Sequence, residues 1–262
     1  MTSAPADLAP RQRGARVFPL PLTGRYLRIR YLDSDSMEQV VSLERARGIR
    51  FESARPIREI PSYANQKHTP GMYWSVTADD LVAYESHLES KWLRLLDFEP
   101  DVTALCTQPF DFEGRDQDGP WQHVPDIYAR RQDGTVLLVD VKNPTRLESP
   151  KVLRQAERTR ATCEQLGWNY RMVGEPHPQL WASISWLAGF RRPLHAGAGL
   201  VDRILSLAER PVAIGDLLSF QPSPELARPV VFHLLWHHRL VCDLSKPLRD
   251  YTLVHTAEHA RD

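Results

Sequence analysis

The chain has 262 residues, of which 42% are hydrophobic, and its 33 basic and 33 acidic residues give a formal net charge of +0. This length suits one large domain or two small ones. Proteins that coat nucleic acid without sequence preference are usually basic. The balanced charge excludes that class and leaves any DNA binding to local patches or to partner proteins.

No apolar run approaches the roughly 18 residues that a membrane-spanning helix needs, and residues 1–16 lack the apolar segment of a secretory signal. We therefore expect a cytoplasmic protein with no membrane contact. The three cysteines, Cys106, Cys163 and Cys242, are odd in number and form no Cys-x-x-Cys pair. They support neither a disulfide framework nor a cysteine zinc site, so we expect buried free thiols.

The first 60 residues predict a disordered arm followed by a small β-containing segment. Residues 1–16 are rich in Ala, Pro and Arg, and residues 17–32 alternate partly between apolar and polar side chains, as strands do. Residues 41–50 suit a short helix or an exposed loop, and residues 61–73 are typical of a loop.

A compact core is expected over residues 61–192. Its first elements, in chain order, are a short strand at 82–84, a helix over 86–96, strands at 102–106 and 109–113, and a turn at 115–120. The helix has an apolar face formed by Leu88, Trp92, Leu95 and Leu96.

The second half of the core begins with a β-hairpin in the segment VPDIYARRQDGTVLLVDVKN, residues 124–143. A helix is expected over 150–166 with Gly167 at its end, then a strand at 168–172 and a helix over 179–190. Helix, antiparallel strands, helix and strand together predict an α/β core with a mixed sheet flanked by helices.

Residues 200–256 predict a winged-helix-like domain after a linker at 195–199. Its expected elements are helices at 201–209, 214–220 and 224–238 and strands at 240–244 and 251–255. The third helix is apolar except for Arg228, His233, His237 and His238, and Pro229 predicts a kink or an early start. This composition favours packing or a partner protein over base readout, and we do not expect His237 and His238 to bind metal.

The hairpin ends in an unusual group of charges. An apolar strand leads directly into Asp140 and Lys142, which share one face because strand side chains alternate. With a two-residue loop between the strands, Asp126 would lie opposite Val141, on the other face. A three-residue loop at 132–134, with its glycine in the left-handed conformation, instead puts Asp126 opposite Asp140.

Two carboxylates on one face repel each other unless a cation lies between them. Mg²⁺ binds one or two carboxylates and keeps several waters, and such ions promote hydrolysis of phosphodiesters. A lysine nearby can neutralise the phosphate or orient the attacking water. The alternative is a solvated strand end with a surface ion pair. The repulsion predicts that Asp126→Asn or Asp140→Asn leaves the metal-free melting temperature unchanged or raises it.

A third carboxylate precedes the hairpin in the segment AYESHLESKW. Glu89 follows Ser86 by three residues, the spacing of a capping box, so its local role is to bond the backbone at the helix start. Its functional role would be to project from the first helical turn toward the hairpin and join the metal site. We expect Glu85 to be a solvated residue.

Five motifs in order resemble the TnsA family: ES-x-LE at 85–89, LDFEPDV at 96–102, QP at 108–109, PD at 125–126 and DVK at 140–142. This family comprises endonuclease subunits of heteromeric transposases with a catalytic domain of the PD-(D/E)xK restriction-enzyme type. The resemblance covers roughly residues 60–190 and leaves residues 1–60 unassigned. It implies a restriction-endonuclease-like core followed by a C-terminal helical domain.

The resemblance implies the site residues and the partners. Glu89, Asp126 and Lys142 match the catalytic acid, the central metal-binding aspartate and the active-site lysine. Asp140 occupies the variable acidic position, and the carbonyl of Val141 is a further possible Mg²⁺ ligand, with Mn²⁺ as a substitute ion. The family nicks the 5′ ends of a mobile element in double-stranded DNA, together with a DDE-type transposase subunit and an ATP-dependent regulator.

Two groups of arginines could contact DNA phosphates: Arg45, Arg47, Arg50, Arg55 and Arg58 before the core, and Arg154, Arg158 and Arg160 on the helix over 150–166. Solvated helix faces explain both groups equally well. Two other functions stay open beside the transposase subunit. One is a restriction or phage-defence nuclease of the same fold, and the other is a winged-helix DNA- or protein-binding module on an inactive nuclease scaffold.

Overall fold

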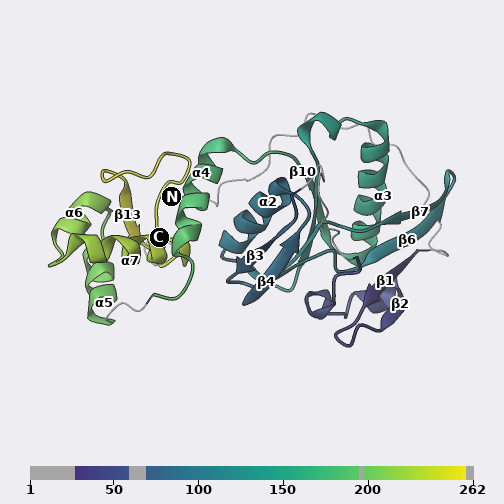
Figure 1. Cartoon of the computed structure of the whole chain (residues 1–262), viewed down its shortest axis with the longest axis horizontal. Coiled ribbons are helices and arrows are strands. Elements are labelled where there is room, and N and C mark those ends of the chain that lie inside the picture. The colour runs from purple at the N-terminus through teal and green to yellow at the C-terminus, as the bar shows by residue number, and fades with distance from the viewer. Residues whose placement is uncertain (1–26, 59–68, 195–197, 258–262) are drawn as a thin grey trace. The chain divides into compact units, whose positions relative to one another are not determined.

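The computed structural model describes residues 27–58, 69–194 and 198–257. They form two compact units that divide between Glu175 and Pro176 (Figure 1). The arm expected at 1–16, residues 17–26 of the alternating segment, the first part of the loop expected at 61–73 and residues 195–197 of the expected linker lie outside the described residues. None of the described helices is long and apolar enough to cross a membrane.

The first unit contains the mixed sheet that the sequence predicts. Its strand order is β10-β9-β8-β5, in which β10 runs parallel to β9 and the other neighbours are antiparallel. The strands are β5 (Val102–Thr107), β8 (Ile127–Arg131), β9 (Val136–Val141) and β10 (Asn169–Val173). The α/β expectation is therefore confirmed at this level.

A second sheet in the same unit has the order β2-β1-β6-β7 and is antiparallel throughout. Its strands are β1 (Arg28–Leu32), β2 (Glu38–Ser42), β6 (Asp111–Asp116) and β7 (Gly119–His123). Strand β7 was not expected, because Gly119 and Pro120 are turn signals. It forms because it pairs with β6 as an edge strand, where a proline removes no ladder hydrogen bond.

An aromatic core joins the two sheets. Phe51, fully buried in the short 3-10 helix η2 (Phe51–Ser53), packs edge-on against Tyr31, Phe110, Tyr128 and Trp168 at ring-centroid distances of 4.6–6.2 Å. Burying a ring of this size contributes about 1.5–3 kcal/mol. The segment 27–58, which also holds α1 (Leu43–Ala46), is therefore built into the core of this unit.

Helices cover the mixed sheet on both sides. Figure 1 shows α2 (His87–Phe98) with the hairpin of β3 (Gly71–Ser75) and β4 (Asp80–Tyr84) on one side and α3 (Pro150–Leu166) on the other. Gly167, at φ 74°, ends α3 in the left-handed conformation that glycine tolerates. A short 3-10 helix, η3 (Pro144–Arg146), leads from β9 toward α3.

The second unit consists of short helices and a three-stranded antiparallel sheet of order β11-β13-β12. Its elements are α4 (Pro178–Leu187), η4 (Ala188–Phe190), α5 (Ala198–Leu207), β11 (Val212–Ala213), α6 (Ile214–Ser219), α7 (Pro224–Trp236), β12 (Leu240–Val241) and β13 (Leu253–Thr256). Helix α4, expected in the core up to residue 192, belongs to this unit. Strand β11 was not expected, and β12 is shorter than predicted.

Candidate active site

The loop of the β8–β9 hairpin has three residues, as the functional interpretation requires. Gly134 has φ 83° and donates its N–H to the Arg131 carbonyl at 2.9 Å, and Arg131 donates to the Thr135 carbonyl at 2.9 Å. Ile127 is then paired with Val139. One step beyond this pair, Asp126 lies opposite Asp140, so the predicted parity is confirmed.

The Asp126 side chain is hydrogen-bonded to the last residue of β9 and to the residue that follows it. Its Oδ2 accepts hydrogen bonds from Lys142 Nζ at 2.8 Å and from the Val141 N–H at 2.7 Å. The exposed fractions of the two side chains are 13% for Asp126 and 26% for Lys142, so the ion pair is partly shielded from water. Aspartate 126 and lysine 142 are therefore brought together as predicted.

Asp140 is fully buried, with 1% of its surface exposed, and is held by two residues that the sequence did not indicate. His123 Nε2 lies 2.9 Å from Asp140 Oδ1 and 2.7 Å from Oδ2, and the Tyr170 hydroxyl donates to Oδ2 at 2.7 Å. An ionised carboxylate only accepts hydrogen bonds, so Nε2 carries the proton in this contact.

Glu89 forms the capping box that its spacing predicts. The Ser86 hydroxyl accepts from the Glu89 N–H at 3.2 Å, and the Glu89 carboxylate accepts from the Glu85 N–H and the Ser86 hydroxyl, each at 2.9 Å. The same carboxylate interacts electrostatically with the hairpin: Asp126 raises the pKa of Glu89, and Glu89 raises the pKa of Lys142. The local and the functional roles are therefore compatible.

The carboxylates of Glu89 and Asp126 resist ionisation. Burial raises the pKa of Glu89 to about 7, and repulsion from Asp126 adds to the shift. Burial also raises the pKa of Asp126, with repulsion from Asp140 next in size, and Lys142 offsets these effects only in part. A cation bound to these two carboxylates would relieve the repulsion between their charges.

Asp140 and Lys142 instead lie in surroundings that favour their charged forms. Burial acts to raise the pKa of Asp140, but the attraction of His123 and Lys142 and the Tyr170 hydrogen bond outweigh it and hold that pKa below its usual range. Burial acts to lower the pKa of Lys142, but Asp126, Asp140 and Glu89 together raise it. Asp140 and Lys142 are therefore charged at neutral pH.

Gln108 contacts the backbone of Asp126 and has a strained backbone conformation. It has φ 49°, is 1% exposed and donates its backbone N–H to the Asp126 carbonyl at 3.2 Å. Its amide nitrogen donates to Glu85 Oε1 at 2.7 Å, which fixes the amide orientation and leaves Gln108 Oε1 buried without a hydrogen-bond partner among the described residues.

The donor chemistry suits a hard cation. Glu89, Asp126 and Asp140 offer carboxylate oxygens, which Mg²⁺ prefers, and two protein carboxylates with water suffice for that ion. The described residues contain no group of three or more His, Cys, Asp and Glu side chains arranged to hold a metal ion as they stand. Each carboxylate is instead held by its own donors, so binding an ion requires Asp126 to exchange some of them.

The three arginines expected at DNA have partners within the first unit. Arg154 NH1 lies 3.0 Å from Asp118, and Arg158 forms two bonds of 2.7 and 3.0 Å to Asp116. The Arg160 guanidinium lies 5.7 Å from the centre of the Tyr170 ring. Their contact with DNA stays a prediction.

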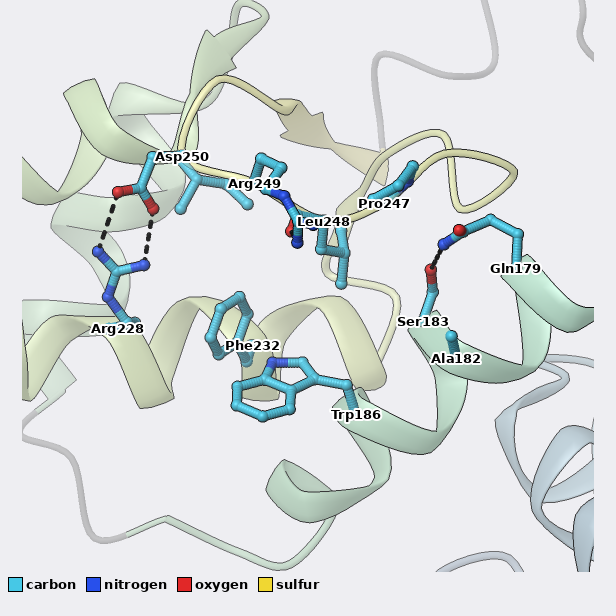
Figure 2. Close-up of a pocket in the computed structure, with 11 residues that line it drawn as sticks. Gln179, Ala182, Ser183, Trp186, Arg228, Phe232, Pro247, Leu248, Arg249 and Asp250 are labelled. Carbon is cyan, nitrogen blue, oxygen red and sulfur yellow. Dashed lines mark hydrogen bonds and ion pairs between the residues drawn. The ribbon is translucent and has the colours of Figure 1, made fainter.

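Arg228 and His233 of α7, and His237 directly after it, have partners within the second unit. Arg228 pairs with Asp250 at 2.7 Å beside a cavity of about 400 Å³, into which Trp186 and Phe232 also project (Figure 2). His233 Nδ1 lies 2.8 Å from the Phe190 carbonyl and His237 Nε2 lies 3.1 Å from the Arg191 carbonyl. These bonds favour a packing role for α7.

A comparison with models of known protein families gives no match to this chain, and a search of curated proteins gives none.

The three cysteines are free thiols. Cys163 is buried, and Cys106 and Cys242 are partly buried.

Sequence reasoning missed His123, Tyr170 and the strained backbone of Gln108. His123 was missed because residues 119–120 have the composition of a turn, which hid the strand that carries it. Tyr170 was recognised only as a member of an alternating strand. Tyr170 lies on the same face of the sheet as Leu138 and Asp140 because of the parallel register of β10 on β9, and no local signal in the sequence reveals that register.

We predict that Glu89 destabilises the metal-free protein as pH rises. Because its folded pKa of about 7 exceeds the unfolded value of 4.5, ionisation costs the folded state more. Its contribution to the free energy of unfolding therefore falls between these pH values, by roughly 3 kcal/mol at most. Glu89→Gln preserves the capping box and removes the titration. In chelator, urea unfolding should show the variant gaining on the parent between pH 4.5 and 8, and a constant difference would contradict this.

We predict that the two hairpin aspartates differ in the metal-free protein at pH 7. Asp140→Asn should lower the free energy of unfolding by about 1–3 kcal/mol, because the ionised carboxylate has charged and hydrogen-bonding partners. Asp126→Asn should leave it unchanged or raise it, because burial and repulsion disfavour its charge. The original expectation is thus kept for Asp126 and reversed for Asp140. Chemical denaturation measures both, and a larger loss at Asp126 would refute the assignment.

Proposed function

We propose that this protein is a metal-dependent DNA endonuclease with a PD-(D/E)xK core and a winged-helix-like C-terminal unit, acting as a subunit of a heteromeric transposase. The observation that carries the proposal is the pairing of Asp126 with Asp140 across the hairpin, with Lys142 Nζ bonded to Asp126. The ordered motifs that resemble TnsA give the biological setting.

The charge that each residue favours indicates its role in the proposed site. Asp126, whose pKa burial raises, is the central ligand, and Glu89 and Asp140 flank it. Mg²⁺, or Mn²⁺ in its place, would neutralise charge on the scissile phosphate and activate water. The carbonyl of Val141 is a further candidate ligand. Lys142 is charged and partly shielded from water. It can therefore bind the phosphate or orient the attacking water once Asp126 exchanges its hydrogen-bond partners.

The element order supports a winged helix in the second unit. Helix α5, strand β11, helices α6 and α7 and strands β12 and β13 follow one another, and β13 lies between β11 and β12 in the sheet. In such domains the third helix reads bases in the major groove. Here seven residues of α7 are buried, and Arg228 is bound to Asp250. We therefore assign this unit to a protein partner, such as the transposase subunit or the ATP-dependent regulator.

The cleavage assay follows from the site. With Mg²⁺ or Mn²⁺ and the proteins encoded by its genomic neighbours, the parent should nick supercoiled DNA that carries the element ends. Asp126→Ala and Lys142→Ala should each lower the rate at least about 100-fold, the scale of losing a group that stabilises transition-state charge. Gel electrophoresis of the nicked and linear products measures this.

Asp35→Ala serves as the control, because Asp35 is an exposed residue of the β1–β2 turn outside the site. It should cut at the parental rate. Parental cleavage by both Asp126→Ala and Lys142→Ala would disprove the endonuclease. Cleavage without neighbouring proteins and without element ends would favour a restriction or defence nuclease.

A further inference from the structure

The Asp140 carboxylate lies where two sheets meet. Asp140 belongs to β9 of the mixed sheet, Tyr170 to the neighbouring β10, and His123 to the end of β7 in the second sheet. The contacts of His123 with Asp140, at 2.7 and 2.9 Å, form a polar connection between the second sheet and the candidate site, and Tyr170 adds a bond of 2.7 Å from within the mixed sheet. His123 and Tyr170 contact no atom of Asp126 or Lys142 in the bonds described above.

The backbone of His123 is held in place by Asp111. Its backbone N–H donates to Asp111 Oδ1 at 3.1 Å, and Asp111 Oδ2 accepts from Arg30 NH2 at 2.9 Å. Asp111 is 4% exposed, so this support is buried. A chain of contacts therefore runs from β1, through β6 and β7, to the carboxylate of Asp140.

Tyr170 is supported from the α3 side. Its ring packs against the aromatic core, and the Arg160 guanidinium lies 5.7 Å from the ring centre. The His123 backbone is thus held by Asp111 and the Tyr170 ring by packing, and the hydrogen bonds from these two residues restrict the rotation of the Asp140 carboxylate. A buried ionised carboxylate costs several kcal/mol unless it is well paired, and an apolar residue of similar size would be cheaper. The charge at position 140 therefore calls for a functional explanation.

The two partners divide the acceptor sites of Asp140 unequally. Oδ2 accepts from both His123 and Tyr170, whereas among the described residues Oδ1 is approached by His123 alone, at the longer distance of 2.9 Å. A carboxylate oxygen has two lone pairs. Oδ2 is therefore saturated, and Oδ1 keeps one acceptor position.

We infer that His123 and Tyr170 are positioning residues that hold Asp140 for one-oxygen binding of a divalent cation through Oδ1. This inference rests on the proposed function and deepens it. It also assigns a role to residues 27–58, which complete the sheet that carries His123 to the site. Partners that orient a metal-binding carboxylate usually change the affinity for the ion 10- to 100-fold when they are removed.

The test is calorimetric titration of the full chain with Mn²⁺, with no DNA present. His123→Leu and Tyr170→Phe should each weaken Mn²⁺ binding about 10- to 100-fold, whereas His123→Gln, whose amide can still donate to Asp140, should recover most of the affinity. Tyr251→Phe, at a tyrosine 76% exposed in the second unit, should bind as the parent does. Circular dichroism confirms that each variant is folded, and Tyr170→Phe carries the test if His123→Leu does not fold.

Parental or tighter binding by Tyr170→Phe and by folded His123→Leu would overturn the inference. Equal loss in His123→Gln and His123→Leu would also overturn it, because the donor would then not matter. Asp126→Asn separates the two claims. If it loses Mn²⁺ while the His123 and Tyr170 variants keep it, only the inference fails. If the parent does not bind Mn²⁺, or Asp126→Asn binds as well as the parent, the proposed metal site fails as well.

Discussion

The site depends on the count of residues in one loop. Residues 132–134 form a three-residue connection because Gly134 adopts φ 83°, a conformation that side chains with a Cβ rarely reach. One residue fewer would move Asp126 to the opposite face of the sheet. The parity of the hairpin brings Asp126 to the end of β9, where the Val141 N–H and Lys142 bind it.

The charges around this hairpin are in conflict in the absence of a cation. Glu89 and Asp126 lie in surroundings that favour their protonated forms, whereas Asp140 and Lys142 lie in surroundings that favour charge. The uneven division is typical of sites where groups are tuned for binding or catalysis.

Local signals allowed much of the fold to be predicted. Helix α3 has the predicted bounds, Pro150–Leu166, because a proline in its first turn and Gly167 after its last are strong boundary signals. Strand β7 was missed because Gly119 and Pro120 are turn signals, although it pairs with the adjacent β6. Strand β11 was missed because it has only two residues and forms by pairing with the distant β13. The same limit applies to the site. The motifs identify Glu89, Asp126, Asp140 and Lys142, but the contacts of Asp140 with His123 and Tyr170 depend on the meeting of two sheets.

The central claim is that the hairpin aspartates form a cation site, and crystallography with Mn²⁺ tests it most directly. Anomalous diffraction from crystals grown with Mn²⁺ locates the ion independently of any activity. The account predicts an anomalous peak within about 2.0–2.3 Å of an Asp126 oxygen, a distance typical of small hard cations, with Asp140 still bonded to His123. A map without a peak at Asp126, in which Lys142 keeps its 2.8 Å bond to that carboxylate, would contradict it.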